Sequence, residues 1–219
     1  MIHHIKIYQF ILIIALFFAI YRKEWKKDSL PFFFIFLIIV NIVENILGPI
    51  AAAYYKSNFF VYNLFIIITV QYYCFLFYSH FKKYSWANKI IYISLFLCLF
   101  SLLNYFFIQG MHVINTLSYN ISMIFVIILI LIYFNDLIRN VGDNNLFYKP
   151  LFLLSIGILL FYTASFPYLV FLNKIAQLGT GLDRQLYSLV KIGNIFLSLS
   201  YIAVLLCPWI SKKQSIELS

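Results

Sequence analysis

Long apolar runs separated by short polar segments dominate the chain. A helix of about 20 apolar residues is long enough to cross the hydrocarbon core of a bilayer. The runs cover residues 7–21, 31–55, 58–81, 90–108, 113–138, 150–172 and 186–210. The pattern therefore predicts an all-α, polytopic membrane protein with seven transmembrane helices in a single transmembrane domain, residues 1–219.

The first run, residues 7–21, has the length of a signal-peptide core. It is followed by Arg22-Lys-Glu-Trp-Lys-Lys27 and not by a small-residue cleavage site, so we interpret it as an uncleaved first span. The longest connection is expected at residues 173–185, where Gly179-Thr180-Gly181 is expected to break the helix.

Composition and charge agree with a membrane protein and indicate its orientation. Of the 219 residues, 64% are hydrophobic and 11% are charged, which is far from the composition of soluble domains. Basic residues lie between the apolar runs and not on one face, so no direct nucleic-acid partner is predicted. The preference for Lys over Arg, with abundant Ile, Phe, Tyr and Asn, is typical of an AT-rich, bacterial genome.

The positive-inside rule predicts the N-terminus outside and the C-terminus inside a bacterial cytoplasmic membrane. In that orientation eleven of the 16 basic residues are cytoplasmic, namely Arg22, Lys23, Lys26, Lys27, Lys82, Lys83, Lys89, Arg139, Lys149, Lys212 and Lys213. The outer side then holds Lys6, Lys56, Lys174, Arg184 and Lys191.

Proline spacing favours an internal repeat. Pro49 follows Pro31 by 18 residues in the second span, and Pro167 follows Pro150 by 17 residues in the sixth. Asn-Leu-Phe or Asn-Ile-Phe, followed by a closing Lys-Lys pair, recurs in the third and seventh spans. The pattern predicts two parallel repeats of three helices joined by the fourth span. Chance recurrence of such residues at helix ends is the alternative interpretation.

Glu44 is the acidic residue that lies deepest within an apolar run. An ionisable group at that depth is costly, which makes it a functional-site hypothesis. Asn41, Glu44, Asn45 and Gly48 stand at i, i+3, i+4 and i+7 and share one helix face. The alternative is a structural role, in which Glu44 forms a hydrogen bond to a neighbouring helix.

Further polar side chains follow helical spacing in the third, sixth and seventh spans. The candidate ligand-binding or polar-core residues are Asn41, Glu44, Asn45, Asn63, Gln71, Tyr162, Lys191 and Asn194. Lys191 is the predicted cationic partner of Glu44 in a pocket open to the outside; alternatively, it is an interfacial lysine. Without a cationic partner, protonation of Glu44 would make it a proton-coupling group. Pro49 and Pro167 are candidate hinges.

Neither a catalytic residue nor a metal or cofactor site is predicted. His80 and His112 fall at span ends, and His3 and His4 precede the first span, so we interpret all four as solvated or interfacial. A retinal-binding protein would also have seven spans, with a Schiff-base lysine in the seventh and an acidic residue one turn before it. Here Lys191 lies too near the span end, and Tyr187 stands where that acidic residue would be.

Residues 103–110, 155–167 and 194–207 resemble an uncharacterised family of small seven-helix bacterial membrane proteins. Some members of that family are encoded beside sensor histidine kinases. The resemblance implies no established activity, and it points to a receptor-like or accessory role with a protein partner. Members often carry a glutamate where this chain has Gln71, which weakens the case for an acid in the third span.

Three functions are consistent with these patterns. The first is a receptor-like or accessory protein that binds a small ligand or a partner and relays a signal to a separate output protein. The second is a small-solute transporter that uses Glu44 and the kinked second and sixth spans. The third is a membrane-embedded enzyme. The sequence disfavours it, because no catalytic or metal-binding arrangement of residues can be recognised.

Overall fold

The computed structural model describes residues 6–24, 29–111, 113–140, 146–178 and 182–217. For residues 140, 172–178, 182–185 and 208–217 it describes the helical backbone alone. His3, His4, His112 and the expected breaker 179–181 lie outside the described residues.

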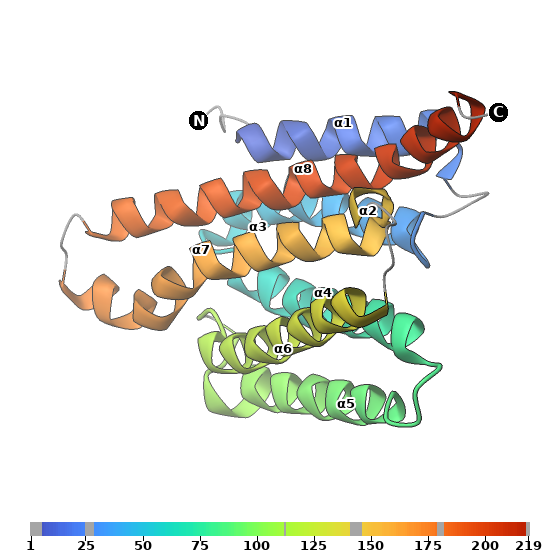
Figure 1. Cartoon of the computed structure of the whole chain (residues 1–219). Coiled ribbons are helices and arrows are strands. Elements are labelled where there is room, and N and C mark those ends of the chain that lie inside the picture. The colour runs from blue at the N-terminus through green and yellow to red at the C-terminus, as the bar shows by residue number, and fades with distance from the viewer. Residues whose placement is uncertain (1–5, 25–28, 112, 141–145, 179–181, 218–219) are drawn as a thin grey trace. The chain divides into compact units, whose positions relative to one another are not determined.

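Every regular element in the described part of the chain is helical (Figure 1), as the apolar pattern predicts. The elements are α1 (Ile7–Tyr21), α2 (Phe33–Ile42), the π-helical turn η2 (Val43–Leu47), α3 (Gly48–Tyr55), α4 (Phe59–Phe81), α5 (Asn88–Leu103), the π-helical turn η3 (Asn104–Ile108), α6 (Thr116–Asn140), the 3-10 turn η4 (Leu146–Tyr148), α7 (Pro150–Leu178) and α8 (Leu182–Glu217).

Six helical segments of the described chain are long and apolar enough to cross a membrane, which supports a multi-pass membrane protein. They are Phe33–Tyr55, Phe59–Phe81, Asn88–Ile108, Thr116–Arg139, Pro150–Phe171 and Leu186–Cys207. Helix α1 has 15 residues and is about 22 Å long, which is less than the ~30 Å hydrocarbon core. The seventh span and the orientation therefore stay predictions.

The predicted connection at residues 173–185 is too long. Helix α7 continues to Leu178 and α8 already begins at Leu182. Helix α8 also continues past residue 210 to Glu217. The reason is that apolar composition marks the part of a helix that faces lipid, whereas helical hydrogen bonding continues into the polar interface.

The chain forms two compact units. Unit 1 comprises residues 1–41 and 140–219, and unit 2 comprises residues 42–139. The predicted repeat would instead group spans one to three and spans five to seven. The repeat stays a prediction, because the units divide the chain by contact and not by similarity.

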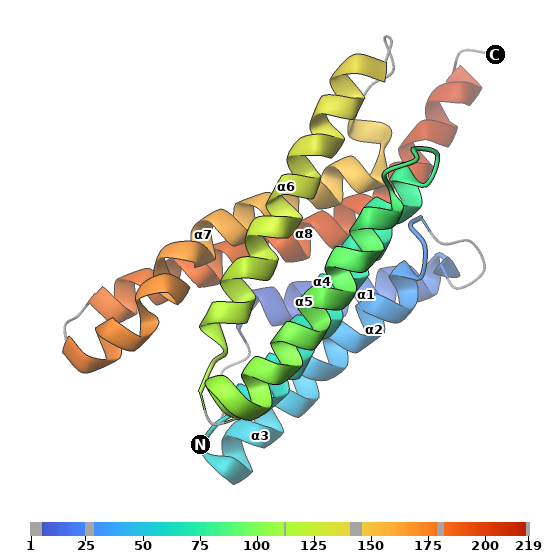
Figure 2. The same ribbon diagram turned by 90° about the horizontal axis from the view of Figure 1, so that it is seen from below.

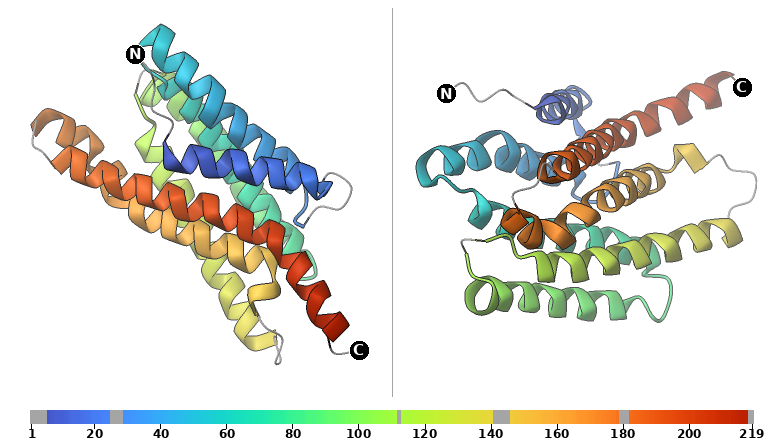
Figure 3. Two further views of the ribbon diagram at one scale, coloured as in Figure 1. Left: turned by 90° about the horizontal axis from the view of Figure 1, so that it is seen from above. Right: turned by 90° about the vertical axis from the view of Figure 1, so that its left-hand side faces the viewer.

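In unit 1, α8 packs along α7 on one side and along α1 on another (Figures 2 and 3). Lys6, just before α1, donates a 3.1 Å hydrogen bond to the Tyr187 hydroxyl near the start of α8. The two helices therefore run parallel. Tyr201 of α8 contacts Phe33 and Phe36 of α2 edge-on, with ring centroids 6.0 and 6.1 Å apart.

In unit 2, α4 holds the other elements together. Its Gln71 amide donates to the Ser94 carbonyl of α5 at 2.9 Å. Near its start, Tyr62 is hydrogen-bonded to η2, and near its end, His80 contacts α6. Because α4 meets α6 at the C-terminal ends of both helices, these two helices run parallel.

Gly157 allows the close approach of α7 and α8. A methyl group on Gly157 would overlap Cβ and Oγ of Ser200, and that hydroxyl already donates to the Leu197 carbonyl at 2.7 Å. Small residues at such positions let transmembrane helices pack closely.

We expect Gly157→Ala to lower the free energy of unfolding by about 1–3 kcal/mol, the usual cost of overpacking. Detergent-denaturation curves in mixed micelles measure the change. Adding Ser200→Gly removes the clashing atoms, so the double variant should recover part of the loss. No recovery would contradict the close approach.

Candidate functional site

Glu44 lies in the π-helical turn η2, and the residues that follow explain why the turn forms. Pro49 has no N–H and cannot donate to the Asn45 carbonyl as an α-helix requires. The Gly48 N–H instead donates to the Val43 carbonyl, five residues back. Such π-helical turns hold an extra residue within a helix and are frequent at functional sites.

The Glu44 carboxylate is buried and hydrogen-bonded across to α4. The residue is 9% exposed, and the Tyr62 hydroxyl donates to its Oε2 at 3.0 Å. Gly48 makes this contact possible, because a methyl group there would lie 2.9 Å from the Tyr62 hydroxyl oxygen. The predicted polar face is thus a buried face, with Asn41, Glu44 and Gly48 buried and Asn45 half-buried.

The arrangement of Glu44 and Tyr62 has two chemical capacities. A carboxylate within a span can take up a proton, or it can bind a ligand that carries a positive charge or a hydrogen-bond donor. The Tyr62 hydroxyl is both a donor and an acceptor, so it can accept a hydrogen bond from a ligand while it donates to Glu44.

Asn63, the next residue of α4, has a structural role. Its amide donates to the Val113 carbonyl at 2.9 Å, and its Oδ1 accepts from the Asn115 N–H at 3.0 Å. Asn104, which begins η3, is fully buried and donates to Gln109 at 2.8 Å and to Ser118 at 3.1 Å. These amides fix the connection between α5 and α6.

The predicted polar-core residues are distributed over both units. Asn41, Tyr162, Lys191 and Asn194 belong to unit 1, whereas Glu44, Asn45, Asn63 and Gln71 belong to unit 2. The predicted pocket around Glu44 and Lys191, with Asn63, Gln71, Tyr162 and Asn194 nearby, stays a prediction.

Three unit 1 candidates have local contacts. The Asn41 and Asn194 amides donate to carbonyls of their own helices at 2.9 and 3.1 Å. Lys191 is exposed, with Nζ 4.8 Å from the centroid of the Tyr187 ring. Its pairing with Glu44 stays a prediction.

Helix α7 contains the candidate hinge Pro167 and bends in its C-terminal half (Figure 1), as an internal proline predicts.

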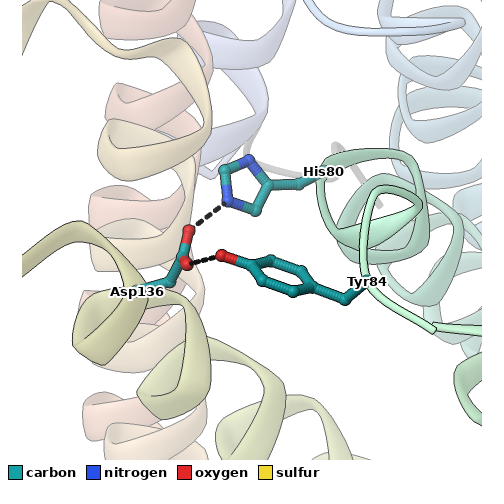
Figure 4. A network of polar contacts seen from close by, with 3 residues as sticks. All are labelled: His80, Tyr84 and Asp136. Carbon is teal, nitrogen blue, oxygen red and sulfur yellow. Dashed lines mark hydrogen bonds and ion pairs between the residues drawn. The ribbon is translucent and has the colours of Figure 1, made fainter. Parts of the chain in front are cut away.

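A second polar site, not predicted from the sequence, joins the far ends of α4 and α6 (Figure 4). His80 Nε2 lies 3.0 Å from Asp136 Oδ2, and the Tyr84 hydroxyl donates to Asp136 Oδ1. The side chains of His80 and Asp136 are 27% and 11% exposed. The sequence analysis did not predict this acidic partner of His80, and the partly exposed ring at the end of α4 is compatible with an interfacial position.

Asp136 escaped the sequence analysis because it lies close to the end of its apolar run. One signal could have found the site. His80 and Asp136 both stand within two residues of a predicted span end, and the predicted topology brings both ends to the same side of the membrane. An acid and a histidine at one depth then become a candidate pair.

The Asp136 carboxylate sets the chemistry of the imidazole. A carboxylate that faces Nε2 favours a proton on that nitrogen, which leaves the lone pair of a neutral ring on Nδ1. The Phe81 and Tyr133 rings contact the imidazole edge-on, with their centroids 4.9 and 4.8 Å from the imidazole centroid. Within the described residues, no group of three or more His, Cys, Asp or Glu could hold a metal ion.

Comparison of the chain with protein-family models, with characterised proteins and with solved structures finds no match.

We expect Tyr62→Phe to lower the free energy of unfolding by about 1.5–3 kcal/mol, because it removes a hydrogen bond to a buried acidic group. Gly48→Ala should act through the same contact by displacing the hydroxyl. The two changes combined should then cost less than the sum of the single changes. Detergent denaturation of the four proteins measures this, and strict additivity would contradict the shared contact.

We expect Asp136→Asn to change the tautomer of neutral His80 from the Nε2–H form to a mixture. Nitrogen-15 spectra of the imidazole report the two tautomers directly. Asn135→Ala, a change at the exposed neighbouring residue, is the matched control and should leave the spectrum unchanged. An unaltered tautomer in Asp136→Asn would contradict the role of the carboxylate.

Proposed function

We propose that the protein is a receptor-like or accessory protein of a bacterial cytoplasmic membrane. In this proposal Glu44 responds to a small ligand or partner, and the change passes to a separate output protein. The observation that supports it most is the buried Glu44 carboxylate, placed in a π-helical turn and bonded to Tyr62.

Helix α4 is the proposed path of the signal. Tyr62 lies 18 residues before His80, which corresponds to about 27 Å along the helix axis. One end of α4 bonds to Glu44, and the other end bonds to Asp136. A rotation or shift of α4 at Tyr62 would therefore alter the contact of His80 with Asp136.

The π-helical turn is the proposed two-state element. Losing or moving its extra residue turns one part of the helix relative to the other by about 100°, the angle per residue of an α-helix. The chain passes from unit 1 to unit 2 between Asn41 and Ile42, directly before this turn. A ligand that binds the two forms unequally would shift their populations.

The proposed partner is an output protein that receives the signal at the cytoplasmic side. The resemblance to seven-helix proteins encoded beside sensor histidine kinases agrees with such a partner. The bilayer is the second partner, since the exposed faces of the spans are apolar.

A small-solute transporter is the second candidate function, and the same buried carboxylate favours it. Carboxylates within spans carry protons in many transporters, and the π-helical turn before Pro49 departs from regular α-helix in mid-span, as the discontinuous helices that line transport sites do. Glu44 would then exchange a proton during each cycle.

Hydrogen exchange measured by mass spectrometry in lipid nanodiscs tests the receptor-like proposal without a known ligand. We expect Glu44→Gln to change amide exchange around Tyr62 and also in residues 82–87, beyond the far end of α4. Asn45→Gln, a change at the half-buried neighbouring residue, is the matched control and should leave residues 82–87 unchanged. A change confined to the Glu44 end would contradict the relay.

Proton flux into proteoliposomes that contain a pH-sensitive dye distinguishes the transporter. A potential-driven flux that is present in the wild type and lost in Glu44→Gln would favour transport over the receptor-like function.

A further inference from the structure

Four exposed basic residues gather at one end of unit 2. Lys82 and Lys83 follow α4, Lys89 lies in the first turn of α5, and Arg139 lies at the end of α6. The bonds of Asp136 to His80 and Tyr84 bring the end of α6 to this same end of α4. We call Lys82, Lys83, Lys89 and Arg139 the basic rim.

The charge of unit 2 is strongly one-sided. Its remaining basic residue is Lys56, between α3 and α4 at the opposite end of α4. Asp136, the acid near the rim, has a largely buried side chain. Its Oδ2 accepts a hydrogen bond from His80 and its Oδ1 accepts one from Tyr84. Lys83 also attracts the Asp136 carboxylate, but the four rim cations outnumber this one nearby acid of unit 2.

Aromatic contacts give the rim a defined shape. The Tyr84 hydroxyl ties the connection between α4 and α5 to α6. Trp86 stacks on the Tyr84 ring at 5.9 Å with an interplanar angle of 19°, and Lys83 Nζ lies 4.9 Å from the centroid of that ring. Trp and Tyr are the residues that membrane proteins place at headgroup depth.

An apolar stripe of α5 begins at the rim. Lys89, Tyr92, Phe96 and Leu99 stand at i, i+3, i+7 and i+10, so they share one helix face. The last three are 70%, 64% and 62% exposed. A cation above an exposed apolar stripe matches a molecule with an anionic head and a hydrocarbon tail.

We propose that the basic rim binds the headgroup of an anionic phospholipid, with an acyl chain along Tyr92, Phe96 and Leu99. Lys and Arg donate charge-assisted hydrogen bonds to phosphate oxygens, and basic pockets at the ends of spans recognise anionic headgroups. The site lies at the end of α4 opposite Glu44, where the proposed relay also ends. It supplies a contact with the membrane itself.

Native mass spectrometry of the detergent-solubilised full chain tests the proposal with short-chain phosphatidylglycerol and phosphatidylcholine. We expect tighter binding of phosphatidylglycerol. We expect Lys89→Gln to weaken that binding about fivefold, since a basic residue near an anionic surface contributes about 1 kcal/mol and 1.4 kcal/mol is tenfold. Lys89→Arg should retain binding, and phosphatidylcholine binding should stay the same in both variants.

Three further changes make the test specific. Lys56→Gln removes the same charge at the opposite end of α4 and should leave both lipids unaffected. Phe96→Ala should weaken both lipids alike, because it removes the contact with the acyl chain. Tyr84→Phe frees the connection from α6 and should lower the preference for phosphatidylglycerol without removing any charge.

Three results would overturn the proposal. The first is equal binding of the two lipids, and the second is an equal loss in Lys56→Gln and Lys89→Gln. The third is binding of soluble glycerol phosphate as tight as that of phosphatidylglycerol, which would show an anion site that does not need the lipid tail.

Discussion

A polar group within an apolar span has to find its hydrogen-bond partner inside the protein, because lipid offers none. Unit 2 is built around this constraint. Helix α4 supplies a partner at each level, with Tyr62 for the Glu44 carboxylate, Asn63 for the backbone before α6, and His80 for Asp136. The position of α4 thus determines which polar groups meet, and both polar sites of the unit depend on it.

The fold was largely predictable, since each span of apolar residues has one stable secondary structure in lipid. Helix α4 begins and ends within one residue of its predicted limits, Asn58 and Phe81. The ends of α7 and α8 were not predictable in this way. Polar residues such as Asn173 and Gln177 lie in helical segments outside the apolar window, where hydropathy no longer reports on the backbone.

The candidate site was predictable in part. The burial of the Glu44 face followed from its spacing, but its donor did not. Tyr62 is one of 18 tyrosines, and only the three-dimensional packing shows that Gly48 leaves room for its hydroxyl. Asp136 was missed for another reason. Hydropathy treats an acid near a span end as solvated, whereas its real environment depends on His80 at the end of α4 and on Tyr84 in the connection that follows.

The division of the chain into units has a consequence for biogenesis. Unit 2 is one continuous segment, whereas unit 1 joins the first 41 residues to the last 80, residues 140–219. During synthesis, the helices of unit 2 leave the ribosome together and can assemble as soon as α6 is complete. Helix α1 packs along α8, which is made only after the whole of unit 2. Helix α1 therefore lacks this neighbour until α8 has been made, and a chain truncated before α8 would leave α1 without it, open to quality-control proteases.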